Sequence, residues 1–493
     1  MGITGIKNLR SIVTFGLVLK YDKRGKTTKA ENTMKRRSIW LGIALLPAIF
    51  LFSQQKSRLI VTGATLIDGK GGPPIPNADV LIEGDRITAI GPRGTFKIKT
   101  GGARIDAAGK FLLPGLIDTH VHLENCGLSD VGELPAAWDS QEKIRELIAI
   151  NARLDLIGGV TTVRDLGSTD MVLHVRDEIN AGHLLGPRIF AAGMQLVKKT
   201  PGAANFRFFL EYDGSDEARA KVRQLASARV DLIKIRLTHQ RTVPSLDEVR
   251  AIVDEAHKLG LRATVHTDVP AEDLVRLSID AGADGIEHNA PLRLKDAGGL
   301  REMARKGMTL MAGSGEFYVQ RFEDAGWGDS VGSAALLLFP GEVAAALRQG
   351  ADTLRTQTAQ LKKSGWDADQ VQKRFIGETD RARKAGVRLI FGTDAGAYLA
   401  IHGEEYKALY GETKMGSSPM EALLMATRDA AKALGKEKEI GTIEPGHLAD
   451  IIIVDANPLE DMRNLHKIFR VIKGGAVYDP AELARPQGSR DKP

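Results

Sequence analysis

The chain has 493 residues, of which 43% are hydrophobic and 26% charged, a composition typical of a globular protein. It excludes a disordered chain, a collagen-like repeat and a coiled coil, and no apolar run reaches the 18 residues typical of a membrane-spanning helix. The single cysteine, Cys126, excludes an internal disulfide bond and a cysteine-based zinc site.

The net charge of +6 is concentrated at the N-terminus of the chain. Residues 1–37 contain ten basic and two acidic side chains, so the remainder of the chain is slightly acidic. This distribution does not support a nucleic-acid partner, because a nucleic-acid surface needs its basic residues within the folded domain.

Residues 34–55 have the three-part pattern of a secretory signal peptide. The basic segment Lys35–Arg37 precedes the apolar stretch Ile39–Phe52, and the polar residues Ser53–Gln55 follow. We therefore predict that residues 1–57 are a leader and that the protein is exported, to the periplasm or the medium. Because the cleavage site is not a clean A-x-A, an uncleaved membrane anchor is an alternative, and a buried core helix is another.

Both ends of the remaining chain have the alternating apolar pattern of short β-strands. The segments RLIVTGATLIDG and ADVLIEGDRITAIGP show it near the N-terminus, and GHLADIIIVDANPL and KIFRVIKGGAVYD show it near the C-terminus. We predict one small β-sandwich domain built from residues 58–112 and 441–480, followed by a polar tail, residues 481–493.

Residues 113–440 alternate short apolar strands with longer amphipathic stretches, which predicts a parallel sheet with crossover helices. Eight candidate strands fit a (β/α)8 TIM barrel with insertions. They span residues 116–122, 159–167, 187–193, 231–235, 262–268, 282–289, 308–315 and 388–396. The longest insertion, residues 316–380, would lie over the barrel mouth, either as a substrate lid or as a helical hairpin on the surface.

Four of these strands end in histidine or aspartate, at the barrel face that carries active sites. His120 and His122 are two residues apart in one strand, so their side chains point to the same side. His266 and His288 end the fifth and sixth strands, and Asp394 ends the eighth. Histidine and carboxylate ligands suit Zn²⁺, and other divalent metals also fit. The pattern predicts a site for one or two metal ions.

The fourth strand carries Lys234 within DLIKI, where the alternation points this side chain into the barrel. A buried ammonium group is costly unless it is paired or chemically changed, and burial lowers its pKa. The free amine can capture CO₂ and form a carbamate that bridges two metal ions. The alternative is an ion pair with Asp394 or Asp165.

Several ordered motifs resemble those of the amidohydrolase superfamily, in its imidazolonepropionase-related and metal-dependent prolidase and carboxypeptidase branch. They are LLPGLIDTHVHL, GVTTVRDLG, DLIKI, HTD, GIEHN, FGTDAG and SPMEALLMATRDAAKALG, and the resemblance covers about residues 58–480. It implies that His120 and His122 bind one metal ion, the more buried α metal, and that His266 and His288 bind the β metal.

The same resemblance implies that carboxylated Lys234 bridges the two metal ions, and that Asp394 contacts the α metal and moves a proton. It implies hydrolysis of a C–N bond by a metal-activated hydroxide, in an amide, peptide-like or cyclic amide substrate similar to those of dipeptidases and N-acyl amino acid hydrolases. The alternatives are a deaminase, a lactone or ester hydrolase on the same barrel, or a non-catalytic metal-binding barrel.

Two further histidines are candidate substrate contacts, His402 and His239, and a loop-structuring role is the alternative for His402. After the strand-four lysine, this chain has RLTHQR where the branch often has two glycines. The expected partner is a small-molecule substrate. A homo-oligomer is possible, and membrane contact is expected only through an uncleaved leader.

Overall fold

The computed structural model describes residues 57–97, 102–127, 140–203, 206–268, 271–288, 297–313, 333–365, 367–397 and 400–485. The predicted leader lies outside these ranges except for its last residue, Ser57, and so do residues 316–332 of the predicted insertion. The described residues all belong to one compact unit, Gln55–Pro493. None of the helices described in this unit combines the length and the apolar character needed to cross a membrane.

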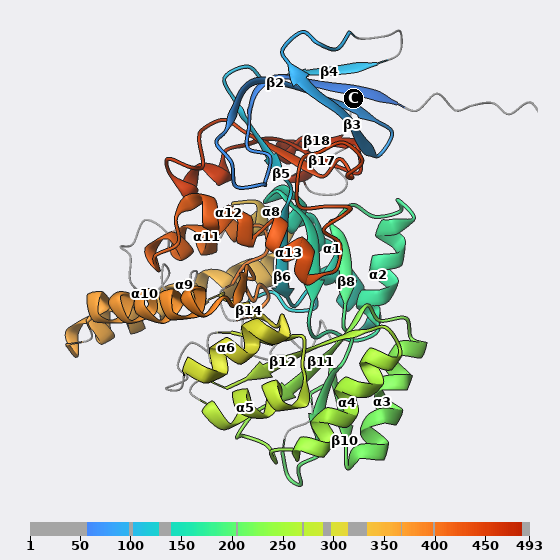
Figure 1. Ribbon diagram of the computed structural model, residues 1–493, viewed down its shortest axis with the longest axis vertical. Helices are drawn as coiled ribbons and strands as arrows, with labels where there is room; N and C mark the ends of the chain where they lie inside the picture. The colour runs from blue at the N-terminus through green and yellow to red at the C-terminus, as the bar shows by residue number, and fades with distance from the viewer. Residues whose placement is uncertain are drawn as a thin grey trace, which may run out of the picture. The chain divides into compact units, whose positions relative to one another are not determined.

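An eight-stranded sheet combines strands from both ends of the described chain, and it lies at the top of Figure 1. Its order is β18-β17-β16-β5-β1-β2-β3, with β4 paired to β1. The two ends meet where β5 pairs antiparallel with β16, and the buried side chains of Val61, Leu112 and Ile453 belong to one apolar cluster. The strands are β1 (Arg58–Leu66), β2 (Ile75–Glu83), β3 (Arg86–Pro92), β4 (Ala103–Asp106), β5 (Phe111–Pro114), β16 (Ile451–Val454), β17 (Ile468–Lys473) and β18 (Ala476–Tyr478).

Two parallel sheets form the centre of the unit. One has the order β6-β7-β8 and the other β10-β9-β11-β12-β13-β14-β15. Their strands are β6 (Leu116–Val121), β7 (Val160–Asp165), β8 (Arg188–Ala191), β9 (Gln195–Lys198), β10 (Phe209–Tyr212), β11 (Leu232–Leu237), β12 (Arg262–Thr267), β13 (Gly285–Glu287), β14 (Thr309–Met311) and β15 (Arg388–Ile390).

Backbone hydrogen bonds join the two parallel sheets at both edges, although strand pairing is not continuous there. The amide of Thr119 in β6 donates to the carbonyl of Phe391 after β15 (3.1 Å), and the amide of Asp231 before β11 donates to Ala191 in β8 (2.8 Å). The strands β6–β8 and β11–β15 thus follow one another in the predicted order. The α/β fold is TIM-barrel-like, as the sequence predicted.

The third predicted strand differs from the expectation because it is divided in two. The chain bends after β8 at Gly193, whose φ of 63° is left-handed, and continues as β9, which pairs with β11. A further strand, β10, lies beside β9. Apolar alternation does not predict this division, because the bend depends on one glycine.

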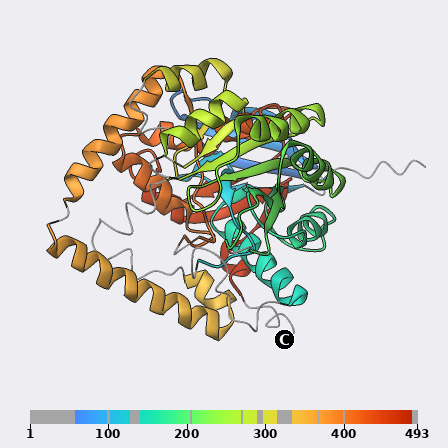
Figure 2. The same cartoon turned by 90° about the horizontal axis from the view of Figure 1, so that it is seen from below.

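Helices pack against the parallel strands, as Figures 1 and 2 show, and local sequence explains several of their starts. Ser245 with Glu248 and Ser418 with Glu421 form capping boxes that satisfy free backbone amides. The helices are α1 (Gln141–Ile157), α2 (Met171–Asn180), α3 (Ser215–Ser227), α4 (Leu246–Lys258), α5 (Glu272–Ala281), α6 (Ala297–Lys306), α8 (Ser333–Leu338), α9 (Gly341–Lys363), α10 (Ala368–Ala385), α11 (Glu405–Lys414), α12 (Pro419–Met425), α13 (Arg428–Ala433), α14 (Pro480–Leu483) and the 3-10 helix η3 (Met462–His466).

The described part of the long insertion between β14 and β15 is helical. Helix α8 packs on α1, where Ala335 shares an apolar cluster with Leu147 and Leu154. Helices α9 and α10 diverge from each other in Figure 2.

Candidate metal centre

The predicted metal ligands come together at the carboxyl ends of the parallel strands. His120 and His122 lie at the end of β6, and Asp394 follows β15. The Nε2 atoms of His120 and His122 are 3.4 Å and 3.1 Å from Asp394 Oδ1. One nitrogen or oxygen atom from each of these three residues lies within 4.8 Å of the other two, close enough to ligate one metal ion.

The second pair of predicted ligands adjoins this group. His288 follows β13, and its ring centroid lies 4.8 Å from that of His120 and 4.7 Å from that of His266 in β12. Lys234 in β11 is 1% exposed, and its Nζ atom is 3.5 Å from His120 Nε2. The structure therefore brings all six predicted ligands into one cluster.

The donor set of this cluster fits a divalent metal ion. Asp394 Oδ1 is buried and accepts no hydrogen bond, although two imidazole nitrogens face it. Burial lowers the pKa of His120 and of His266 well below the usual range, and that of His288 to about 4. Neutral imidazoles keep a lone pair for a metal, and a buried oxygen without a donor is costly unless a cation approaches it.

Two residues of the cluster hold a strained backbone. His288 has a φ of 64° and Asp394 a φ of 62°, and they are two of four non-glycine residues with positive φ in the described part of the chain. A left-handed conformation costs such residues about 1–2 kcal/mol. Strain of this kind gathers at functional sites, where the surrounding structure holds it in place.

A buried glutamate that the sequence analysis missed orients His120. Glu287 Oε2 accepts a hydrogen bond from His120 Nδ1 (2.9 Å), and its Oε1 accepts from Arg164 (2.7 Å) and from Thr264. Burial would raise the pKa of Glu287, but the positive charges of Arg164 and Lys234 lower it overall. A charged Glu287 keeps the proton on Nδ1, so His120 Nε2 is left to face the metal site.

The sequence analysis missed Glu287 because strand alternation places only one of two adjacent residues, here His288, inside the barrel. Both Glu287 and His288 contact His120. The left-handed backbone at His288 allows the two side chains to share one side. The acidic residue beside the histidine in GIEHN was the only signal in the sequence.

The FGTDAG motif packs directly on the strand that carries the histidine pair. A Cβ atom at Gly392 would lie 2.8 Å from the Cβ of His120. One at Gly396, where φ is 95°, would lie 2.3 Å from the carbonyl oxygen of His122. The two glycines therefore allow the close approach that places Asp394 beside both histidines.

Another buried carboxyl group, Asp118, ties these two segments together. Asp118 accepts hydrogen bonds from the amides of His120 (2.9 Å) and Thr393 (3.2 Å) and from the Thr393 hydroxyl (2.5 Å). Burial raises its pKa to about 7, and the hydrogen bonds oppose this rise. Its location inside β6 gave no sign of this role in the sequence.

The side chains of the two candidate substrate contacts do not join those of the cluster of six. His402 is 2% exposed, and its ring nitrogens lie 2.9 Å from Asp155 Oδ1 and 3.4 Å from the carbonyl of His122. This placement favours the loop-structuring alternative over substrate contact. His239 lies after β11 and pairs with Asp273 at 2.8 Å while remaining half exposed, so it stays a candidate at the mouth.

The two carboxylates considered as partners of Lys234 do not pair with it. Asp165 accepts hydrogen bonds from the Leu123 amide and the Ser168 hydroxyl, each at 2.8 Å. Within the described chain, Lys234 forms no ion pair with Asp165 or Asp394. Burial lowers the pKa of Lys234 to about 8, although Glu287 and Asp394 oppose this shift, so an appreciable fraction of the amine is unprotonated at neutral pH.

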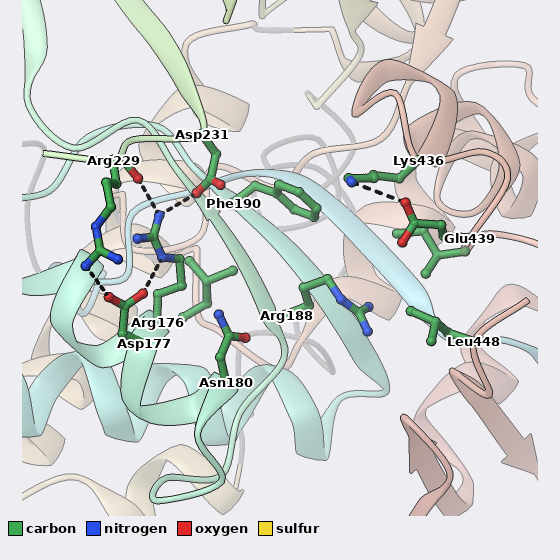
Figure 3. A pocket seen from close by; sticks show the side chains of 12 residues that line it. Arg176, Asp177, Asn180, Arg188, Phe190, Arg229, Asp231, Lys436, Glu439 and Leu448 are labelled. Atoms are coloured by element: carbon green, nitrogen blue, oxygen red, sulfur yellow. Dashed lines mark hydrogen bonds and ion pairs between the residues drawn. The ribbon is translucent and has the colours of Figure 1, made fainter. Parts of the chain in front are cut away.

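A separate cavity of about 410 Å³ lies near the start of β8 and contains none of the predicted site residues. Figure 3 shows that several of its charged side chains pair with one another: Arg176 binds Asp177 and Asp231, and Lys436 binds Glu439. Because TIM barrels carry their chemistry at the opposite ends of the strands, we assign the active site to the histidine cluster instead.

Comparisons with known proteins identify a family and several similar enzymes. The model of the amidohydrolase family matches residues 111–478. A 5-methylthioadenosine/S-adenosylhomocysteine deaminase of Symbiobacterium thermophilum is 25% identical over 85% of this chain and 90% of its own. An imidazolonepropionase of Hyphomonas neptunium is 25% identical over 83% of this chain and 96% of its own.

The fold is shared with solved structures as well. A Xaa-Pro dipeptidase crystallised with methionine in its active site has a TM-score of 0.67 and 28% identity, covering 86% of this chain and 100% of that one. The family match over residues 111–478 agrees with the TIM-barrel-like fold of this chain and with the histidine pair and aspartate at its strand ends. The chain belongs to the amidohydrolase family, metal-dependent hydrolytic enzymes that act on C–N bonds of small molecules.

Proposed function

We propose that this enzyme hydrolyses the amide bond of dipeptides or N-acyl amino acids at a zinc centre in the histidine cluster. The observation that carries the proposal is the buried Asp394 Oδ1 atom, which accepts no hydrogen bond while the Nε2 atoms of His120 and His122 face it. Similarity to a Xaa-Pro dipeptidase structure supports this substrate class.

Six residues would hold the metal. His120, His122 and Asp394 form one group of ligands, and His266 and His288 supply a second pair of imidazoles. When bound, a divalent metal polarises a carbonyl group and makes water acidic enough to attack it near neutral pH. Zinc suits this set of nitrogen and oxygen ligands.

Carboxylation of Lys234 is the second part of the proposal. Its Nζ atom lies 3.5 Å from His120 Nε2, pairs with neither Asp165 nor Asp394, and has a pKa lowered to about 8 by burial. An unprotonated amine reacts with CO₂ to form a carbamate and release a proton. The carbamate would turn an unpaired buried cation into an anion with two oxygen ligands.

The chain itself supplies the proton transfer. The Asp394 carboxylate would take a proton from the attacking water and return it to the leaving nitrogen. Glu287 holds the ring of His120 in one orientation throughout, because its charge is fixed by Arg164.

Asp394→Asn tests this role. The amide is nearly isosteric, so the fold should remain, but it cannot carry the proton. We expect kcat/KM to fall by at least about 10²–10⁴-fold, measured on a panel of dipeptides and N-acyl amino acids, with an unchanged circular dichroism spectrum. A variant that keeps the wild-type kcat/KM would refute the assignment.

A deaminase is the second candidate, favoured by the 25% identity to the Symbiobacterium thermophilum enzyme. It would cleave an exocyclic C–N bond of a nucleoside and release ammonia. Assays of 5-methylthioadenosine and of the amide panel on one preparation separate the two functions. Ammonia release from the nucleoside with no amide hydrolysis would replace our proposal by this one.

A further inference from the structure

A buried chain of polar contacts leads from helix α1 to the strand that carries the histidine pair. Asp155 lies in the last turn of α1, and its Oδ1 atom is 2.9 Å from Nδ1 of His402. The other ring nitrogen of His402, Nε2, is 3.4 Å from the carbonyl oxygen of His122. Because both ring nitrogens face acceptors, both carry a proton, and His402 is a cation paired with the Asp155 carboxylate.

A second carboxyl group, that of Glu405 at the start of α11, packs against the same end of α1. A Cβ atom added at Gly158, which follows α1, would lie 2.7 Å from Glu405 Oε2. A Cβ atom added at Gly403 would lie 2.5 Å from the carbonyl oxygen of Leu154. The two glycines therefore let the start of α11 come close to the helix end that carries Asp155.

Each of these two carboxyl groups has one oxygen atom without a partner. Asp155 and Glu405 are at most 1% exposed, and within the described chain neither Asp155 Oδ2 nor Glu405 Oε2 accepts a hydrogen bond. Their other oxygen atoms are occupied, one by His402 and one by the amide of Gly403 at 3.0 Å. Among the described residues, no lysine or arginine forms an ion pair with either group.

One cation cannot neutralise two buried carboxylates. His402 balances the charge of Asp155, and a second negative charge beside this pair would be costly. Burial, together with the charges of Asp155 and Asp118, raises the pKa of Glu405 well above its usual range. A proton on Glu405 removes the excess charge, and the resulting O–H group supplies the donor that the free oxygen of Asp155 lacks.

We propose that Glu405 is a neutral acid that donates a hydrogen bond to Asp155, and that these two residues position the metal ligand His122 through His402. The inference rests on the proposed metal centre and hydrolytic function. The ring of His122 has its own partner, because its Nδ1 atom lies 3.1 Å from the carbonyl oxygen of Gly167. The ring and the backbone of this ligand are thus each held by one contact, as is typical of residues that bind metal ions.

Infrared spectroscopy tests the proton on Glu405 whether or not metal is bound. A protonated carboxyl group has a carbonyl stretch separate from the bands of a carboxylate. The difference spectrum of the wild type minus Glu405→Gln at pH 7 should therefore contain the protonated band. Glu255→Gln is the matched control and should remove carboxylate bands only, because Glu255 is a buried helix residue that pairs with Arg223. Carboxylate bands alone for Glu405 would overturn the proposal.

Metal affinity, measured by competition with a chelator, tests the positioning of His122. Glu405→Gln keeps a donor toward Asp155 and should bind Zn²⁺ as the wild type does. Glu405→Met has a similar size but no donor, and Asp155→Asn cannot hold a charged His402. We expect both to bind Zn²⁺ about 10–100-fold more weakly and to change the visible absorption spectrum of bound Co²⁺, which reports ligand geometry.

Three results would contradict this role in different ways. Equal Zn²⁺ affinities and Co²⁺ spectra in all four proteins would show that the two acids do not position the ligand. Loss of one metal equivalent in Glu405→Gln would show that the two free oxygens hold a cation instead of a proton. If the wild type binds no metal, the proposed function and the positioning role fail together, whereas the infrared difference still decides the state of Glu405.

Discussion

At the scale of single residues, Glu287 determines which nitrogen of His120 faces the metal site. Its carboxylate accepts from His120 Nδ1 and is held in place by Arg164 and Thr264. Partners of this kind typically contribute 10–100-fold to metal affinity. The cluster therefore depends on a residue that is not itself a predicted ligand.

We expect Glu287→Gln to lower metal affinity by about 10–100-fold, because the amide cannot match the charge that holds His120 and Arg164. Competition with a chromogenic chelator measures this change. Glu255→Gln is the control, since Glu255 is also buried and paired with an arginine, Arg223, but lies on α4. An equal loss in both variants would show that Glu287 acts only through general stability.

A second buried carboxyl group, Glu412 in α11, predicts how stability depends on pH. Burial raises its pKa from 4.5 to about 8, although Arg383 opposes the shift, and its Oε1 atom accepts no hydrogen bond. The folded protein therefore keeps a proton that the unfolded chain releases near pH 4.5. Its contribution to stability is fully present below that pH and is lost as the pH rises through about 8.

Glu412→Gln stays neutral at every pH and should remove this dependence. Between pH 5 and pH 8.5, the free energy of unfolding of the wild type should fall by on the order of a few kcal/mol relative to that of the variant. Unfolding midpoints of the two proteins at both pH values measure the difference. If the difference between the two unfolding midpoints is the same at both pH values, Glu412 does not titrate in this range.

At the scale of elements, the FGTDAG segment and β6 form the contact on which the centre is built. The amide of Asp394 donates to the carbonyl of His120 (2.8 Å), and the amide of His122 donates to that of Ala395 (2.7 Å). Gly396 packs so closely on the carbonyl group of His122 that the segment leaves no room for a Cβ atom there. Displacing this segment would move a ligand relative to its partners.

Gly396→Ala should therefore lower both thermal stability and metal content. Gly446→Ala is a matched control, because Gly446 has nearly the same φ, 96° against 95°, but has nothing within 4 Å of an added Cβ. Both variants incur the cost of a left-handed alanine, about 1–2 kcal/mol, and only the first adds a clash. Equal melting temperatures and metal contents in the two variants would contradict this account.

Sequence periodicity predicted the order of the eight strands, because each buried parallel strand is a short apolar run between turns. It could not predict the division of the third strand at Gly193 or the added β10. It also missed Glu287 and Asp118, whose roles depend on contacts between strands distant in sequence. The histidine and aspartate candidates were predictable because they stand at strand ends, which converge in a barrel, and Lys234 was predictable from the alternation of side chains within its strand.

At the scale of the whole molecule, both ends of the described chain form one sheet. The antiparallel pairing of β5 with β16 joins residues more than 300 positions apart, and Asp450 before β16 binds Arg188 of β8 at 2.6 Å. Asp450 also accepts from the Gly115 amide, so the sheet contacts β6 and β8 at their amino ends, whereas the histidine cluster lies at the carboxyl ends of the parallel strands. The proposal that the preceding leader exports the enzyme depends on the sequence pattern alone.

The central claim is that the histidine cluster holds the catalytic metal, and metal content per chain tests it most directly. We propose to measure it by mass spectrometry of the wild type, His120→Ala, His266→Ala and His257→Ala after gel filtration. His257 lies on α4 and pairs with Asp284 at 2.8 Å. We predict bound metal in the wild type and in His257→Ala, and a large loss in the other two variants. Equal metal content in all four proteins would contradict the account.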